Sequence, residues 1–147
     1  MPTYHGSESL GFLLSQTYRK LTQLVTLRLK AYEITPEQFH VLYRISQHDG
    51  LNQKEIALRS AKDQPTTTRI LDALMKKGLV QKQASTTDRR AFLVFATAKG
   101  KEVVAETAPM EAQAIADAVD GIDPAQVELL KTILSQVKDN MEKLLGE

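Results

Sequence analysis

The chain has 147 residues, of which 42% are hydrophobic and 25% are charged, and its formal net charge is +1. This length and apolar content suit a single domain over residues 1–147 with a core of its own. The chain has no cysteine, which excludes disulfides and a thiol redox switch. Because no export signal and no run of about 18 apolar residues is visible, we expect a cytoplasmic protein without a membrane span.

The charges are divided unevenly along the chain. Residues 52–101 hold eleven Lys and Arg against four Asp and Glu, whereas residues 102–147 hold three against ten. A basic middle and an acidic end would let one face meet phosphate while another face repels it. Solvated helices can produce such a division by chance, but the pattern favours nucleic acid as a partner of the middle segment.

The first predicted elements are two helices. From Leu10 to about Tyr32 the apolar residues recur every three or four positions, which predicts one long amphipathic helix. Thr35, Pro36 and Gln38 then give a cap, a first-turn proline and the reciprocal capping-box residue of a second helix. We expect Gly50 to end that helix.

A helix-turn-helix pattern follows. Asn52 and Glu55 have capping-box spacing at the start of a helix predicted to run to Ala61. After the short link Lys62-Asp63, a further helix is expected to begin at the N-cap Asp63 and to close at Gly78.

That further helix has two different sides. Its predicted core side consists of Thr67, Ile70, Leu71 and Leu74, and its outward face consists of Pro65, Thr68, Arg69, Asp72 and Lys76. Short polar side chains beside one arginine suit base edges in a DNA major groove. An ordinary amphipathic surface helix is the alternative interpretation of this segment alone.

Two strands and two helices complete the chain. Runs Leu79 to Ala84 and Ala91 to Ala96 predict a hairpin with a basic tip. Thr97 is expected to cap a helix from Ala98 toward Val119, which Pro109 should kink or interrupt. A last helix from Asp123 carries apolar residues at heptad spacing, and such a seam needs a partner, either the first helix of the chain or a second copy.

Helix, turn, helix and a hairpin with a basic tip are the order of a winged helix-turn-helix. The run from Leu51 to Val103 resembles the MarR family of bacterial transcriptional regulators. The marks that carry this resemblance are Thr68-Arg69, Leu71-Asp72 with Leu74, Lys77-Gly78-Leu79-Val80, Asp88-Arg89-Arg90-Ala91, and Thr97 with Gly100.

The resemblance implies a mainly α (α+β) fold with a DNA-binding lobe at 35–97 and dimerisation helices at 1–34 and 98–147. It implies a homodimer, most simply a repressor, that reads a pseudo-palindrome in double-stranded DNA with half-sites about 34–36 Å apart. The expected dimerisation residues are Leu10, Leu13, Leu14, Val127, Leu130, Leu134, Val137, Met141 and Leu144.

The resemblance also assigns DNA-binding roles. Near the helix start, Gln64, Thr66 and Thr68 would meet bases or phosphates. Arg69 would make the strongest groove contact, to bases or to the backbone, and Lys76 and Lys77 would serve solvation or phosphate. At the wing, Arg90 would enter the minor groove while Asp88 forms the turn and orients it. The expected DNA-binding set is Gln64, Pro65, Thr66, Thr68, Arg69, Lys76, Asp88, Arg89 and Arg90.

In the resembled family, small aromatic or anionic effectors bind between the dimerisation helices and the DNA-binding lobe. Candidate effector residues are Tyr18, Arg19, Phe39, His40, Tyr43 and Arg44, although an aromatic residue at helical spacing is more often core. We expect no cofactor and no metal site, because His5, His40 and His48 lack ligand spacing.

Three other functions are alternatives to an effector-controlled DNA-binding regulator. A metal-responsive regulator remains possible, because carboxylates could complete a site around a histidine in space. An enzyme is disfavoured, since the phosphate-loop, nucleophile-elbow and zinc-protease motifs are missing. A winged-helix module that binds protein would be expected to lack the polar, basic character of Thr66, Thr68, Arg69 and Arg90.

Overall fold

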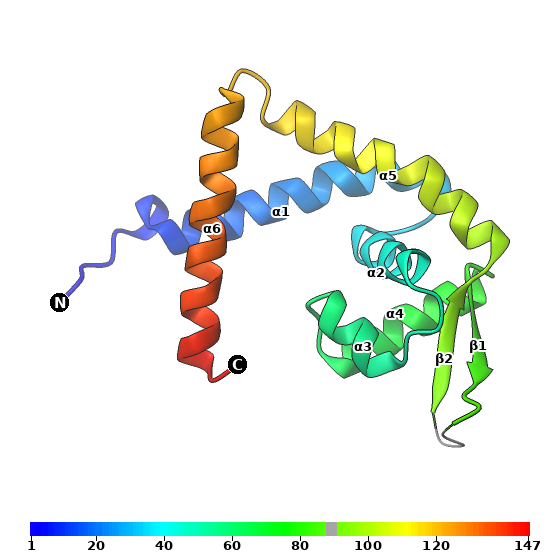
Figure 1. The fold of residues 1–147 in the computed structure, drawn as a ribbon. Helices are drawn as coiled ribbons and strands as arrows, with labels where there is room; N and C mark the ends of the chain where they lie inside the picture. The colour runs from blue at the N-terminus through cyan, green and yellow to red at the C-terminus, as the bar shows by residue number, and fades with distance from the viewer. Residues whose placement is uncertain (88–90) are drawn as a thin grey trace. The chain divides into compact units, whose positions relative to one another are not determined.

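The structure is a computed structural model that describes residues 1–87 and 91–147. It is a mainly helical winged helix-turn-helix fold with one two-stranded antiparallel sheet (Figure 1). The chain forms two compact units, Met1–Ala114 and Ile115–Glu147. None of the helices formed by the described residues is long and apolar enough to span a membrane.

The first unit begins with a long helix. After a 3-10 turn, η1 (Gly6–Glu8), helix α1 runs over Leu10–Leu29 and continues as a 3-10 turn, η2 (Lys30–Tyr32). The amide of Phe12 donates to Ser9 Oγ at 3.1 Å, which fixes the start of α1. The prediction of one helix from Leu10 to about Tyr32 is therefore confirmed, with a tighter last turn.

Helix α2 (Pro36–Gln47) has the predicted capping box. The amide of Gln38 donates to Thr35 Oγ1 at 3.1 Å, and the amide of Thr35 donates to Gln38 Oε1 at 3.2 Å. The helix ends before Gly50, so the prediction that Gly50 ends it was wrong by a few residues. Gly50 instead has φ +82 and donates its amide to Val94 at 3.1 Å, which turns the chain toward the hairpin.

Helices α3 (Gln53–Arg59) and α4 (Gln64–Lys76) form the helix-turn-helix. Helix α3 is shorter than predicted, and the connection to α4 spans residues 60–63 rather than Lys62-Asp63 alone. The reason is a left-handed Ala61, with φ +54, that lets the amide of Lys62 donate back to the carbonyl of Ala57 at 3.0 Å. This bond closes the last turn of α3.

The hairpin consists of β1 (Val80–Ala84) and β2 (Phe92–Ala96). The strands are antiparallel, with Val80 opposite Ala96 and Ala84 opposite Phe92. Each strand starts one residue later than predicted. An isolated bridge between Leu51 and Val94 joins the start of the helix-turn-helix to the hairpin.

Helix α5 (Ala98–Ala118) starts where predicted, with the amide of Gly100 donating to Thr97 Oγ1 at 3.0 Å. Pro109 was expected to kink or interrupt this helix, and the interruption was wrong, because Pro109 lies inside one continuous helix. Proline cannot donate to the carbonyl four residues earlier, that of Ala105. Ala105 and Pro109 are both exposed, so solvent can take the place of the missing donor.

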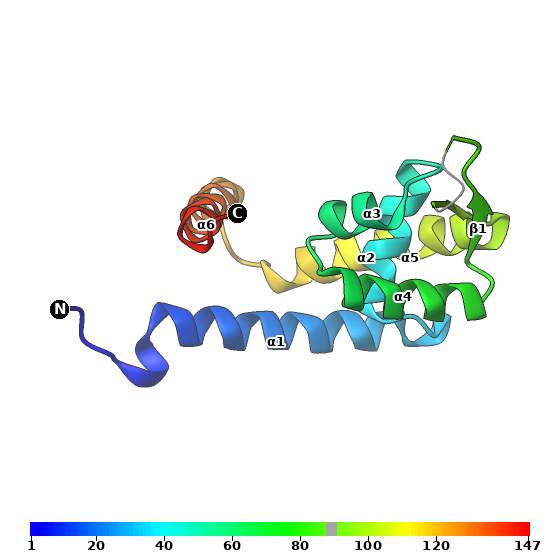
Figure 2. The ribbon, with the colours of Figure 1, turned by 90° about the horizontal axis from the view of Figure 1, so that it is seen from below.

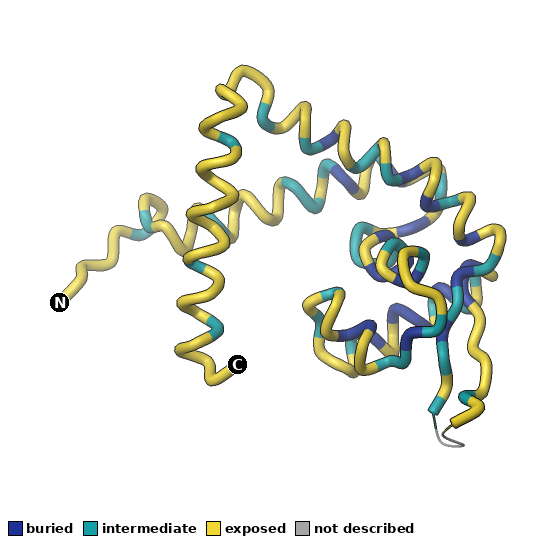
Figure 3. The backbone as a smooth tube through the Cα atoms, in the orientation of Figure 1, coloured by how far each residue is buried: buried dark blue, intermediate teal, exposed yellow. Residues whose placement is uncertain are grey.

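The core of the first unit lies among α2, α3, α4 and the hairpin, which gather into one cluster in both views (Figures 1 and 2), and it extends to residues of α1 and α5. Its largest fully buried apolar side chains are Leu29, Val41, Leu42, Ile45, Ile56, Ile70, Leu71, Leu74 and Val94. Figure 3 shows that burial is concentrated on the inner sides of these elements. The core side of α4 is thus held in place while its other side faces solvent.

The second unit contains α6 (Pro124–Leu145). The carboxylate of Asp123 accepts the amide of Ala125 at 2.9 Å, which agrees with the predicted start of this helix, and its C-cap is Gly146, whose φ is +78. None of the residues of α6, all of which the structure describes, is buried. No element of its own unit therefore covers its apolar seam.

Candidate DNA-binding interface

Helix α4 has the two sides that its sequence predicts. Thr67, Ile70, Leu71 and Leu74 are all buried, at 0 to 1% exposure. Every residue of the outward face, Pro65, Thr68, Arg69, Asp72 and Lys76, is exposed. The periodicity of α4 thus separates core residues from a polar surface available to a partner.

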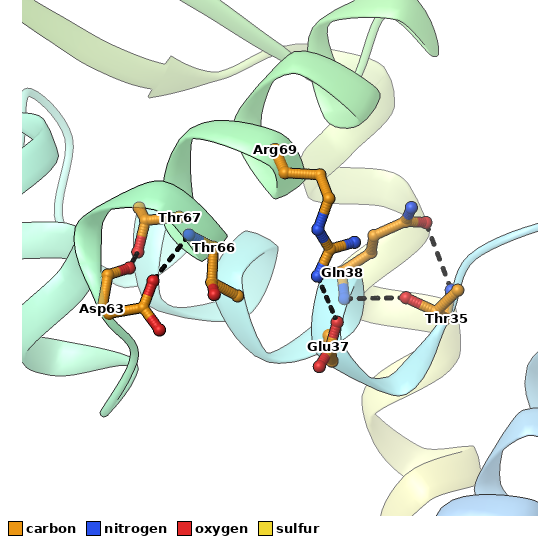
Figure 4. Close-up of polar contacts among 7 residues, drawn as sticks. All are labelled: Thr35, Glu37, Gln38, Asp63, Thr66, Thr67 and Arg69. Carbon is orange, nitrogen blue, oxygen red and sulfur yellow. Dashed lines mark hydrogen bonds and ion pairs between the residues drawn. The ribbon is translucent and has the colours of Figure 1, made fainter.

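The start of α4 is a tight cap (Figure 4). Asp63 Oδ1 accepts the amide of Thr66 at 2.8 Å, and the Thr67 hydroxyl donates to the Asp63 carbonyl at 2.8 Å. Hydrogen bonds from Thr66 hold the pKa of Asp63 below its ordinary value. The amide of Thr66 is therefore taken by Asp63 and does not point freely toward a phosphate. Gln64 is exposed and Thr66 is half-buried.

Arg69 is not a free cation in this structure. Its Nη2 lies 3.1 Å from Glu37 Oε2, in the first turn of α2, and the two side chains are 65% and 42% exposed (Figure 4). An exposed pair of this kind adds little stability, but it orients the guanidinium. Arginine has five N–H donors, so Arg69 keeps donors for DNA while the pair persists. Sequence reasoning missed Glu37, which is typical of any helix first turn.

Thr68 is also held by neighbours. Its hydroxyl donates to the Gln64 carbonyl at 3.0 Å and accepts a hydrogen bond from Nε2 of Gln53. Gln53 lies at the start of α3, and sequence reasoning did not select it. The polar part of the outward face is therefore connected to both α2 and α3.

The two lysines at the end of α4 differ. Lys76 is exposed, as expected for a residue of the outward face. Lys77 is half-buried, and its Nζ donates to the Glu33 carbonyl and, at 2.9 Å, to Gln38 Oε1. The expectation that Lys77 serves solvation or phosphate was wrong, because its ammonium ties the end of α4 to the corner between α1 and α2.

The described part of the hairpin supplies a further cation, Lys82. Nζ of Lys82 lies 5.8 Å from the centre of the exposed Phe92 ring, on the opposite strand. Asp88, Arg89 and Arg90, which were predicted to form the wing tip, lie outside the residues that the structure describes.

A cavity of about 560 Å³ lies behind the helix-turn-helix. It is lined by parts of α1, the start of α2, the turn between α3 and α4, and Glu111 of α5. Three of the predicted effector residues, Tyr18, His40 and Arg44, line it together, whereas Arg59, Lys62 and Glu111 were missed by sequence reasoning.

The remaining predicted effector residues are placed differently. A neighbouring cavity of about 430 Å³ has Phe39, His40, Tyr43 and Arg44 in its lining. Phe39 is only 4% exposed and belongs to the core. Arg19 is exposed and lines neither of these two cavities.

The larger cavity is rich in charge. Its lining includes the cations Arg44, Arg59 and Lys62 together with two carboxylates, Glu37 and Glu111. The hydroxyl of Ser60, also in the lining, is buried without a hydrogen-bond partner. Three cations and an unused hydroxyl give this cavity the chemistry to hold a small anion.

His40 contributes a titratable group to both cavities. Burial lowers its pKa from the ordinary value, the nearby Glu111 opposes that shift, and Lys62 and Arg44 add to it. The distance from His40 Nε2 to Glu111 Oε1 is 3.6 Å. Within residues 1–87 and 91–147, no three His, Asp or Glu residues form a group that could hold a metal ion.

Known proteins with a similar sequence or fold support a DNA-binding role for the helix-turn-helix and hairpin. The MarR family model matches residues 34–92. A structure of BpsR from Bordetella bronchiseptica, described in terms of the regulation of its DNA binding by 6-hydroxynicotinic acid, has a TM-score of 0.88 and 25% sequence identity, covering 94% of this chain and 99% of that chain. The transcriptional repressor CouR, bound to a 23-mer DNA duplex, has a TM-score of 0.83 and 26% identity over 94% of this chain and 99% of its own.

A third structure, the transcriptional regulator PA3341, is 30% identical to this chain. Its TM-score is 0.79, and the match covers 92% of this chain and 99% of that chain. The chain therefore belongs to the MarR family and, with it, to the DNA-binding transcriptional regulators.

Proposed function

We propose that this protein is a transcriptional repressor that binds a pseudo-palindromic operator as a homodimer and responds to a small aromatic or anionic effector. The observation that carries the proposal is the outward face of α4, an exposed polar surface with one arginine on a helix whose other side is core. This face would lie in the major groove, with Thr68 and Arg69 at the base edges and Lys76 near phosphate. The predicted minor-groove contact of Arg90 belongs to the same proposal.

Exposed apolar residues on two helices support the homodimer. Leu10 and Leu13 on α1, and Leu130, Leu134, Met141 and Leu144 on α6, are each at least 40% exposed. Leu14, Val127 and Val137 are half-buried. Uncovered apolar stripes of this kind mark interaction surfaces. Residues 1–34 and 98–147 would then join two copies and hold two α4 helices about 34–36 Å apart, one helical turn of DNA.

The 560 Å³ cavity supports the effector. Its cations Arg44, Arg59 and Lys62 would face the anionic group, and the Ser60 hydroxyl would gain the partner that it lacks. BpsR, whose DNA binding 6-hydroxynicotinic acid regulates, supports an aromatic acid as the class of ligand. Such a ligand switches the protein only if it binds the DNA-bound and the free arrangement with unequal affinity.

The test begins with selection of bound fragments from random duplex DNA, followed by binding measurements at several salt concentrations. Arg69→Ala should lower affinity for the selected site by about 5- to 150-fold and relax one position in each half-site. Lys76→Ala should weaken all sequences alike. Lys20→Ala, which removes an exposed lysine of α1, serves as the control and should change neither quantity.

A chain that stays monomeric at micromolar concentration would refute the homodimer. Failure to bind duplex DNA even at low salt would refute the proposed function as a whole. If Arg69→Ala instead weakened every sequence equally, Arg69 would be a phosphate contact rather than a base contact.

A further inference from the structure

The hydroxyl of Thr68 has a fixed number of hydrogen bonds to give and to receive. A threonine hydroxyl carries one proton and two lone pairs. Its proton goes to the Gln64 carbonyl at 3.0 Å, one turn earlier in α4. Nε2 of Gln53 donates into one lone pair. One lone pair therefore remains, so Thr68 can offer DNA an acceptor and no donor.

The amide orientation of Gln53 follows from the same proton. If the carbonyl oxygen of Gln53 faced Thr68, two carbonyl oxygens would compete for the single hydroxyl proton. With the NH₂ group facing Thr68, both bonds are satisfied. The second N–H and the carbonyl oxygen of Gln53 then stay available on the exposed side.

Gln53 is well placed to hold this orientation. It is the first residue of α3, directly after Asn52, whose Oδ1 accepts the amide of Glu55 at 2.8 Å and whose Nδ2 donates to Glu55 Oε1 at 3.0 Å. Gln53 also lines a cleft of about 270 Å³ with Lys54 of α3 and with Lys82 and Phe92 of the hairpin. Its backbone is thus fixed by the cap, and its side chain lies between the hairpin and α4.

We propose that Gln53 is a specificity-determining positioning residue, which fixes the Thr68 hydroxyl as a hydrogen-bond acceptor and so selects a base that donates. The inference rests on the proposed function, because it requires α4 to lie in the major groove. In that groove adenine N6 and cytosine N4 are donors, whereas guanine O6 and N7 and thymine O4 are acceptors. The strand that Thr68 contacts should therefore carry adenine or cytosine at that position.

The experiment measures base discrimination rather than affinity alone. Competition binding with duplexes that carry each base pair at every half-site position should show about 5- to 10-fold discrimination at one position in the parent, the range expected for one hydrogen bond. Thr68→Val, which removes the hydroxyl at nearly constant shape, identifies that position by abolishing the discrimination. Gln53→Ala should abolish it at the same position, and the double variant should lose nothing further.

Two variants separate positioning from other roles. Gln53→Glu replaces the donor by an acceptor, so it should also lose the preference for adenine or cytosine. Lys54→Ala, the exposed neighbour, should weaken all duplexes alike and leave the preference intact. Thermal unfolding of Gln53→Ala should match that of the parent, since the Gln53–Thr68 hydrogen bond is exposed.

The possible results separate a failure of the proposed function from a failure of the role inferred for Gln53. A parent protein that ignores duplex DNA overturns the proposed function and this inference together. A parent that binds and discriminates, while Gln53→Ala discriminates equally well at the Thr68 position, overturns this inference alone. A preference for thymine that survives in Gln53→Ala would also overturn it, because it would show that Thr68 reads the base through its methyl group.

Discussion

The junction between the hairpin and α5 should not tolerate a side chain at Gly100. A Cβ atom there would lie 2.1 Å from the Leu79 carbonyl oxygen and 3.0 Å from its carbonyl carbon. Because the obstacle is backbone, it cannot move aside as a flexible side chain could. The same carbonyl accepts the amide of Thr97 at 3.0 Å, so a displacement also strains the cap of α5.

The magnitude follows from two opposing effects. Overpacking of this kind costs about 1–3 kcal/mol, and a backbone obstacle favours the upper end. Against this cost, alanine stabilises a helix by about 0.8–1 kcal/mol relative to glycine. We therefore expect Gly100→Ala to lose about 2 kcal/mol, which lowers the midpoint of thermal unfolding by about 4–8 °C for a chain of this size.

The matched control is Gly11→Ala in the first turn of α1, where an added Cβ would meet no atom within 4 Å. This substitution also replaces glycine by the better helix former alanine but creates no clash, so the midpoint of thermal unfolding should rise by up to about 2–4 °C. Thermal unfolding of the parent and both variants should be followed by circular dichroism at one protomer concentration. Equal midpoints for Gly100→Ala and Gly11→Ala would refute the steric reasoning.

Two further predictions concern the turn before α4 and the half-exposed His40. Ala61→Gly should raise the free energy of unfolding, measured in urea, by about 0.5–1 kcal/mol. The left-handed φ of +54 costs an alanine about 1–2 kcal/mol, and the greater freedom of glycine in the unfolded chain offsets part of the relief. The control Ala116→Gly, in the exposed part of α5, should lower the free energy of unfolding instead. Burial lowers the pKa of His40 in the folded state, so the unfolded chain takes up this proton at a higher pH than the folded chain does. The free energy of unfolding should therefore fall as the pH drops from above about 6.5 through the lower pKa of the folded state. Because Glu111 opposes the lowering, Glu111→Gln should move the NMR titration midpoint of His40 further down, and an unchanged or higher midpoint would contradict the assignment.

Much of the architecture could be predicted because local chemistry determines it. Thr35 and Asp63 cap helices with their own side chains, and the period of α4 alone separates Leu71 and Leu74 from Arg69. These features depend on residues within one or two turns of each other. Sequence reasoning therefore placed the helix starts and the outward face correctly.

The contacts that sequence reasoning missed join distant parts of the chain. Glu37 and Arg69 are 32 residues apart, and Gln53 and Thr68 are 15 apart. Lys77 was taken for a surface charge, although its ammonium reaches the corner between α1 and α2. Periodicity says which side of a helix a residue occupies, but not which neighbouring helix lies within reach of its side chain.

Lys77 holds the C-terminal end of α4 in place. Its ammonium binds the carbonyl of Glu33, the left-handed residue at which α1 gives way to α2, and its own carbonyl accepts Nζ of Lys99 from α5 at 3.2 Å. This end of α4 is thus tied to the corner after α1, to Gln38 of α2 and to Lys99 of α5. Because Lys77 fixes the C-terminal end of α4 to this corner, a displacement of the corner would be passed directly to α4.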